Sequence, residues 1–225
     1  GPLEHAVVLS PEARPLDCSG ADGIGGAGCR HLPRHPGLVV IPSFIDSWRT
    51  SLLRSCNLPV EQRSLLASFM GRGIHDTYAT SENFRGLLQT LIPVDNFLIS
   101  EYSASYAQIM GQSLFCLVPK GHGTWSHRLY EVILVGCIPV ILSDDVELPF
   151  SGLPWDTFSV RWPMRQINND TFPRHLRHLE TTGVVQTLKA NVDRHTCWFD
   201  YHSTQDSCSP LWGVTHGLRA LLEKK

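Results

Sequence analysis

Two five-residue runs of apolar side chains dominate the middle of the chain, residues 114–118 and 138–142. Runs of this length, apolar throughout, are typical of strands buried inside a parallel sheet. Between the runs, four residues recur at the spacing of one helix face: Leu129, Val132, Ile133 and Gly136. The pattern predicts a strand–helix–strand unit over residues 114–142, with Gly136 ending the helix.

The same alternation continues on both sides of this unit. Apolar runs at 37–42, 65–71, 96–100 and 158–162 indicate further strands, and the residues at 82–91 and 103–112 favour helices. Two longer helical stretches are expected at about 171–193 and 211–224. Alternating strands and helices predict an α/β fold, a Rossmann-like parallel sheet with helices on both faces. Residues 1–36 are rich in Gly and Pro and are expected to be a linker or edge segment, which leaves 37–225 as the domain.

The loop KGHGTWS, residues 120–126, follows the first strand of the central unit and precedes its helix. Ligands of open α/β sheets bind at this kind of position, and helix amides there favour an anion. Lys120 supplies a positive charge, and Ser126 is predicted to cap the helix or to lie in its first turn. Arg128 and Glu131 share one flank of the helix and could hold a diphosphate and a ribose. The alternative is that these two residues form only a surface ion pair.

Charge and known motifs exclude several other functions. The net charge of −2 argues against a nucleic-acid partner, and no run approaches the length of a membrane span. The loop has neither the P-loop order of glycines and lysine nor the glycine spacing of dinucleotide enzymes, and no G-x-S-x-G motif occurs. His122 and His127 lack a third ligand at suitable spacing, and Asp144-Asp145 is typical of a turn, so no metal site is expected.

The seven cysteines form no C-x-x-C pair. Cys116 and Cys137 lie in or next to the apolar runs and are expected to be buried, inert thiols. The sequence predicts disulfides in the loop-like segments, Cys197 with Cys208 and Cys18 with Cys29, if the compartment is oxidising. Asn169 begins an N-glycosylation sequon, which also favours the secretory pathway.

Several segments resemble the exostosin family, glycosyltransferase family 47. They are FCLVPKG, the S-x-R-x-x-E pattern of Ser126, Arg128 and Glu131, and GCIPVILSDDVELPF. The similarity extends upstream to VVIP at 39–42, to LLASFMGRG followed by Arg85, and to Tyr106, Met110 and Ser113. The similarity is good from about residue 37 to residue 160 and weak beyond. The motifs look closer to those of plant and algal members than to those of the animal polymerases.

The resemblance implies the C-terminal, donor-binding half of a two-domain GT-B enzyme. Such an enzyme performs inverting transfer from a nucleotide sugar, by expectation a UDP-sugar, to a glycan or glycoprotein acceptor, without a metal or other cofactor. Ser126 and Arg128 would face the diphosphate and Glu131 the ribose, while Gly71 and Arg72 would approach from the opposite wall.

The family also implies a further N-terminal half outside this sequence, and a Golgi type II membrane protein anchored outside it. The catalytic base is unknown, with His75 and Asp76 the local candidates. The alternatives are an exostosin-like interaction module without turnover and, less favoured, a nucleotide sensor of similar fold.

Overall fold

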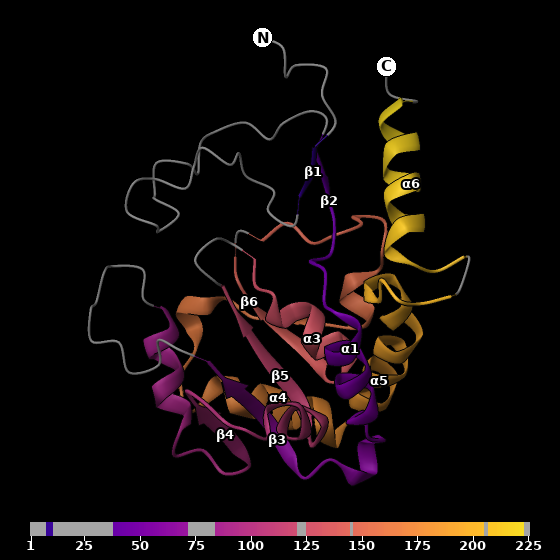
Figure 1. Ribbon diagram of the computed structural model, residues 1–225. Helices are drawn as coiled ribbons and strands as arrows, with labels where there is room; N and C mark the ends of the chain where they lie inside the picture. Colours follow the sequence, from indigo (N-terminus) through magenta and orange to yellow (C-terminus); the bar gives the residue numbers. More distant parts are fainter. Residues whose placement is uncertain are drawn as a thin grey trace.

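The computed structural model describes residues 8–10, 38–71, 84–120, 125–144, 146–204 and 207–222. Its centre is a parallel sheet of five strands in the order β4-β3-β5-β6-β7 (Figure 1). The strands are β3 (Leu65–Met70), β4 (Phe97–Ser100), β5 (Ser113–Pro119), β6 (Ile138–Leu142) and β7 (Val160–Arg161). All seven residues of β5 and all five of β6 are buried. The predicted α/β parallel sheet is confirmed.

The strand order places a switch point between β3 and β5. From β3 the chain moves outward to β4, then returns past β3 to β5 and continues in the other direction to β6 and β7. In open α/β sheets, connections on the two sides of such a point lie on opposite faces and leave a crevice at the carboxyl ends of the strands. The structure therefore positions a ligand crevice at the ends of β3 and β5.

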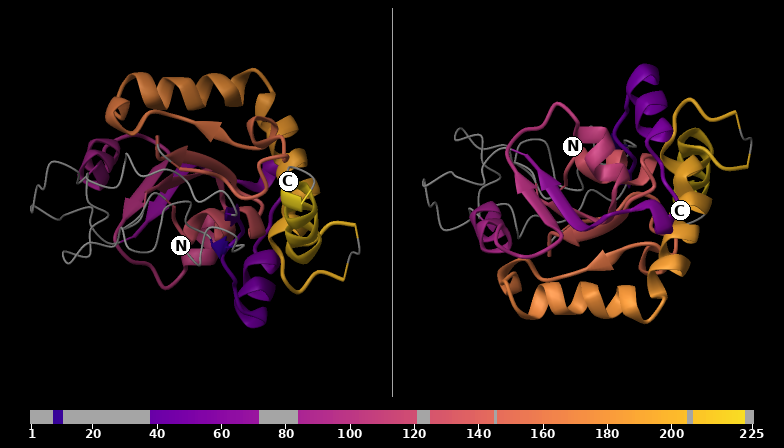
Figure 2. Two further views of the ribbon diagram at one scale, coloured as in Figure 1. Left: turned by 90° about the horizontal axis from the view of Figure 1, so that it is seen from above. Right: turned by 90° about the horizontal axis from the view of Figure 1, so that it is seen from below.

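Helices cover both faces of the sheet. The helices α1 (Ser47–Ser55), α2 (Tyr106–Gly111) and α3 (Arg128–Leu134) lie on one face, and α4 (Thr171–Thr181) lies on the other (Figure 2). Two helices complete the chain, α5 (Val184–His195) and α6 (Pro210–Leu222). The 3-10 helices are η3 (Val60–Gln62), η4 (Phe84–Leu91), η5 (Trp155–Thr157), η6 (Met164–Gln166) and η7 (Thr196–Phe199). Within the part of the chain described, no helix has the length and hydrophobicity needed to cross a membrane.

The predicted unit at 114–142 forms as expected, β5 followed by α3 and β6. The two strands pair in parallel from Phe115 opposite Ile138 to Pro119 opposite Leu142. After α3, Gly136 adopts a left-handed φ of 68°. The amide of Gly136 donates to the Ile133 carbonyl and that of Cys137 to the Val132 carbonyl, the hydrogen bonds of a Schellman cap. Gly136 therefore ends the helix, as predicted.

A small parallel pair stands apart from the main sheet. Its strands are β1 (Val8–Ser10) and β2 (Leu38–Val40), with Val8 opposite Leu38. The run at 37–42 is thus a strand, as predicted, and it pairs with a segment of the expected linker. Gly217 of α6 approaches β2 so closely that an added Cβ would lie 2.8 Å from Val39.

Three sequence predictions are corrected by the structure. Ser126 precedes the N-cap of α3, which is His127, and no side chain caps this helix. The stretch at 171–193 is two helices, because Gly183 turns the chain with a left-handed φ of 76°. Residues 84–91 form the 3-10 helix η4 and not an α-helix.

The prediction that Cys116 and Cys137 are inert thiols is wrong. Both are fully buried, as expected, but their sulfurs form a disulfide of 2.07 Å. Cys116 lies in β5 and Cys137 immediately before β6, so neighbouring strands bring their Cα atoms to 5.9 Å. The predicted disulfide between Cys197 and Cys208 is confirmed. Cys18 and Cys29 lie outside the described residues.

A buried arginine ties together the ends of several elements. Arg63 is 8% exposed and lies between η3 and β3. Its guanidinium donates to the carbonyls of Ser113 at 2.7 Å, Leu58 at 2.9 Å and Met110 at 3.4 Å. Burial lowers the pKa of Arg63 to about 10, which leaves it protonated at neutral pH. This one side chain satisfies carbonyls that would otherwise be buried without a donor.

Candidate functional site

A cleft of about 520 Å³ lies at the carboxyl end of β3, on the β3 side of the expected crevice, between the segment that follows β4 and the helices α1, α2 and α3. Its walls include three residues singled out from the sequence, Gly71, Arg128 and Glu131. The remaining lining residues are Trp48, Arg49, Leu52, Leu53, Met70, Glu101, Tyr102, Ser103, Ala104, Tyr106, Ala107 and Gln108. The volume suits a small-molecule ligand such as a nucleotide.

Arg128 lies at the first position of α3 and reaches across to β3. Its guanidinium donates a hydrogen bond to the carbonyl of Met70, the last residue of that strand. The same group lies 4.5 Å from the centroid of the Phe69 ring and 5.3 Å from that of Tyr106. These cation–π contacts hold the positive charge over the wall of the cleft.

Gly71 makes this approach of Arg128 sterically allowed. A Cβ at position 71 would lie 2.8 Å from Nη2 of Arg128 and 2.9 Å from the Phe69 ring. Contacts this short do not occur, so any larger residue would force the guanidinium of Arg128 or the Phe69 ring to shift. The amide of Gly71 is fixed by donation to the carbonyl of Ser100 at 3.0 Å. Gly71 and Arg128, far apart in the sequence, therefore form one structural unit.

Glu131 lies one turn further along α3 and is 5% exposed. Its Oε1 accepts from Nε of Arg49 at 2.7 Å and forms an ion pair with Nη2 of Arg49 at 2.6 Å. Its Oε2 accepts from the hydroxyl of Tyr106. Burial raises the pKa of Tyr106 well above its ordinary value, so the hydroxyl stays protonated and donates.

These contacts decide against a surface ion pair between Arg128 and Glu131. The carboxylate of Glu131 is buried and pairs with Arg49 of α1, while Arg128 points to β3. The carboxylate is thereby held in one orientation in the cleft wall. A carboxylate has about four acceptor positions, and Arg49 and Tyr106 leave some of them for a ligand hydroxyl.

The other sequence candidates either do not line the cleft or fall outside the described residues. Lys120 directly follows β5 and is partly exposed, but neither it nor Ser126 lines the cleft. Nδ1 of His127, also considered as a ligand, lies 2.9 Å from the hydroxyl of Ser43. Arg72, His75, Asp76, Gly121, Gly123, His122 and Asp145 fall outside the described residues. Among those described, no group of three or more His, Cys, Asp or Glu is arranged to hold a metal ion.

Arg49 and helix α1 were missed from the sequence. The helix buries Thr50 and Leu53, whereas its apolar Trp48 is 64% exposed and Leu52 is 39% exposed. Both exposed residues line the cleft, so the hydrophobic pattern of this segment does not follow the protein core. A local signal was nevertheless present, because Asp46 caps the helix by accepting from the amide of Arg49 at 2.9 Å.

Comparison with known proteins identifies the family. The model of the exostosin GT47 domain matches residues 40–177, more than half of the chain. The chain belongs to the exostosin GT47 family. The cleft residues Arg49, Gly71, Tyr106, Arg128 and Glu131 all lie inside the matched range.

Several curated plant members of the exostosin family are similar to this chain. A probable glucuronosyltransferase of Oryza sativa subsp. japonica is 34% identical over 151 residues, which cover 59% of this chain and 33% of the relative. Probable glucuronosyltransferase 47 A of Physcomitrium patens is 45% identical over 141 residues, 54% of this chain and 28% of the relative. The probable beta-1,4-xylosyltransferase IRX10L of Arabidopsis thaliana is 44% identical over 62 residues, 27% of this chain and 15% of the relative. The aligned regions therefore span about a third of these relatives or less.

Proposed function

We propose that this chain provides the nucleotide-sugar-binding half of a glycosyltransferase. The observation that carries the proposal is the convergence of Gly71, Arg128 and Glu131 on one cleft at the sheet switch point. The names of the plant relatives support transfer of a glucuronosyl or xylosyl group. The donor class is then a nucleoside-diphosphate sugar, by family expectation a UDP-sugar, and the acceptor is a glycan or glycoprotein.

The cleft suggests how the donor would bind. The diphosphate would displace the Met70 carbonyl as the partner of the Arg128 guanidinium, because a dianionic group is the stronger acceptor. A ribose hydroxyl would donate a hydrogen bond to the carboxylate of Glu131, whose orientation is set by Arg49 and Tyr106. The uracil ring would lie between the exposed aromatic side chains that line the cleft, Trp48 and Tyr102.

The chemistry follows from this placement. In an inverting transfer an acceptor hydroxyl attacks the anomeric carbon, and the bond to the nucleoside diphosphate breaks. Arg128, which lines the cleft, would stabilise the negative charge that develops on the departing diphosphate. No metal ion is assigned to this step. The base that takes the proton of the acceptor hydroxyl would come from a segment outside the described residues or from a further domain.

Cellular location is part of the same proposal. The disulfides Cys116–Cys137 and Cys197–Cys208 fit an oxidising compartment, and Asn169 of the sequon is exposed. We place the protein in the Golgi lumen, with a type II membrane anchor and an N-terminal half in the full-length enzyme. Its product would belong to a cell-wall or related polysaccharide.

Calorimetric titration of UDP tests the donor site. Wild-type protein is expected to bind UDP, and Arg128→Ala should weaken binding by about 1.5–3 kcal/mol, the contribution of a charge-assisted hydrogen bond. Glu131→Gln should weaken UDP binding but leave inorganic phosphate binding unchanged. Arg194→Ala is the matched control, because Arg194 is exposed on α5 and does not line the cleft. Equal UDP affinity in wild type and Arg128→Ala would contradict the proposal.

A further inference from the structure

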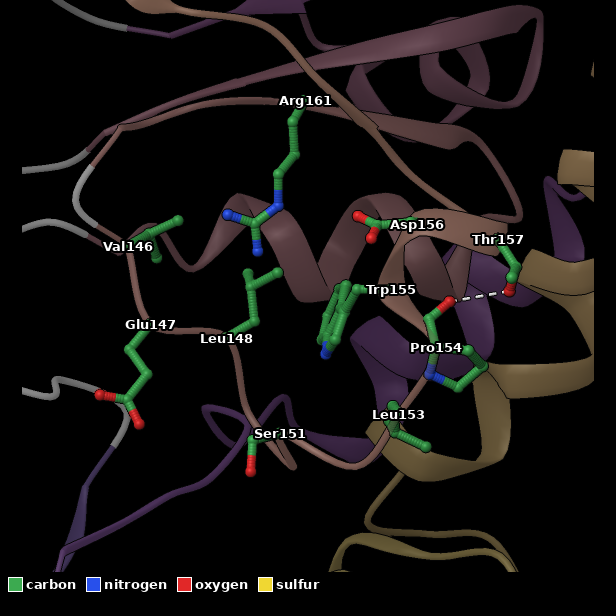
Figure 3. A pocket seen from close by; sticks show the side chains of 10 residues that line it. All are labelled: Val146, Glu147, Leu148, Ser151, Leu153, Pro154, Trp155, Asp156, Thr157 and Arg161. Atoms are coloured by element: carbon green, nitrogen blue, oxygen red, sulfur yellow. Dashed lines mark hydrogen bonds between the residues drawn. The ribbon is translucent and has the colours of Figure 1, made fainter.

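A second pocket, of about 490 Å³, lies in the β6–β7 part of the molecule (Figure 3). Arg161, the last residue of β7, lines one side, and the segment 146–157 that follows β6 supplies all other lining residues. Both strand ends belong to the carboxyl edge of the sheet, the edge that also carries the donor cleft. Parallel strands are about 4.8 Å apart, so β7 lies about 10 Å from β5 along this edge.

The wall of this pocket is fixed by contacts on both sides. Nε1 of the buried Trp155 donates to the Pro149 carbonyl at 3.0 Å. The Thr157 hydroxyl donates to the Pro154 carbonyl at 2.7 Å, the dashed line in Figure 3. Phe150 has a φ of 50°, which is strained for a bulky side chain. A strained residue persists only where its surroundings hold it in place.

Phe150 is held by two neighbours from distant parts of the chain. Its amide donates to the Val40 carbonyl of β2 at 3.3 Å, and its ring packs 5.8 Å from that of Trp198. Gly213 of α6 gives the ring its space, because a Cβ there would lie 2.5 Å from it. Contacts with β2, η7 and α6 therefore hold in place the loop whose residues on either side of Phe150 line the pocket.

The lining combines one cation, two carboxylates and an apolar floor. Figure 3 shows the Arg161 guanidinium directed into the pocket above Leu148, with Glu147 and Asp156 on either side. Among the residues described, the guanidinium of Arg161 has no hydrogen-bond or ion-pair partner. Other apolar lining residues are Val146, Leu153, Pro154 and Trp155.

This chemistry matches a neutral sugar better than an anion. Carboxylates accept hydrogen bonds from hydroxyl groups, the guanidinium donates to ring and hydroxyl oxygens, and the floor can contact the apolar face of a pyranose. A phosphate or other anion would gain Arg161 but would share the pocket with the carboxylates of Glu147 and Asp156. Two like charges beside the ligand disfavour that occupant.

We propose that the pocket of residues 146–157 and Arg161 binds a neutral sugar unit of the acceptor glycan. The assignment to the acceptor rests on the proposed function, in which the donor occupies the separate Arg128 cleft. A glycan chain seated here would lie along the same sheet edge and direct its next units toward the donor. Arg161 and Asp156 are the residues that would determine which acceptor is held.

Titration by NMR tests the pocket with defined probes. Xylotetraose and cellotetraose, both neutral, are added to the full chain while the indole N–H signal of Trp155 and the side-chain Nε–H signal of Arg161 are followed. Both signals are expected to shift at millimolar sugar. Arg161→Ala should raise the dissociation constant about tenfold, as expected for loss of a hydrogen bond to a charged group, and Asp156→Asn should raise it several-fold. Arg194→Ala, at an exposed arginine that does not line the pocket, should leave the dissociation constant unchanged.

Three results would overturn the pocket assignment. They are no shift with either neutral sugar, equal binding by wild type and Arg161→Ala, and tighter binding of inorganic phosphate or glucuronate than of the neutral sugars. UDP titrated into the same samples separates the two proposals. If UDP binds and the sugars do not, the pocket assignment fails and the donor site stands. If the sugars bind and UDP does not, the pocket is a sugar site and the donor-site proposal fails.

Discussion

Replacing Gly71 by alanine should disable the donor cleft through one added methyl group. The new Cβ would lie 2.8 Å from Nη2 of Arg128 and 2.9 Å from the Phe69 ring, so the guanidinium must leave its position over that ring. Overpacking of this kind costs about 1–3 kcal/mol. For a chain of this size each 1 kcal/mol lowers Tm by about 2–4 °C. Gly71 does not have a left-handed φ, so crowding alone is the cause.

The assay measures thermal unfolding and UDP affinity on the same samples. On binding UDP, Arg128 would exchange the Met70 carbonyl for the diphosphate while its guanidinium stays over the Phe69 ring. Displacing the guanidinium from that ring should therefore weaken UDP binding by about tenfold or more, since a hydrogen bond to a charged group contributes about 1.5–3 kcal/mol. Gly86→Ala is the matched control, because no atom lies within 4 Å of a Cβ built at Gly86 of η4. That control should unfold at the wild-type temperature or slightly higher. Unchanged UDP affinity in Gly71→Ala would refute the reasoning.

Three further predictions concern stability and modification. Arg63→Met should lower the free energy of unfolding, measured in urea, by at least about 3 kcal/mol, because several carbonyls lose their hydrogen-bond donor. Arg63→Lys should recover only part of this loss. Full recovery by lysine would count against the role of the planar guanidinium. The Cys116→Ala/Cys137→Ala double variant should lose about 3 kcal/mol of unfolding free energy, and reduction of the wild type, which also breaks Cys197–Cys208, should lose more. Stability equal to the wild type would argue against the Cys116–Cys137 disulfide. Protein from a secretory host should lose apparent mass when it is treated with a deglycosylating enzyme, and the Asn169→Gln variant should not. If the enzyme leaves the mass of the wild type unchanged, Asn169 is not glycosylated.

The sequence predicted the sheet well because its strands are buried on both faces. Runs such as 114–118 and 138–142 are apolar throughout, and this pattern has few alternatives at that length. Gly136 was also predictable, since a left-handed cap favours glycine. The Cys197–Cys208 disulfide was predicted for a different reason, because both cysteines lie in a loop-like segment that a disulfide would stabilise in an oxidising compartment.

The parts that were missed depend on tertiary contacts. Helix α1 exposes Trp48 and Leu52 to a cleft, so its apolar residues do not mark the core. Arg49 meets Glu131 across 82 positions of sequence, a separation at which no local pattern operates. The Cys116–Cys137 disulfide was missed because a buried cysteine in an apolar run looks the same whether it is free or paired.

A crystal structure of the chain with bound UDP would show whether the Arg128 cleft is the donor site. We expect a diphosphate oxygen within hydrogen-bond distance of the Arg128 guanidinium, and we expect the guanidinium to be released from the Met70 carbonyl. We also expect a ribose hydroxyl against Glu131, which keeps its contacts with Arg49 and Tyr106. UDP bound elsewhere, or bound in the cleft with Arg128 still on the Met70 carbonyl and no contact to Glu131, would contradict the account.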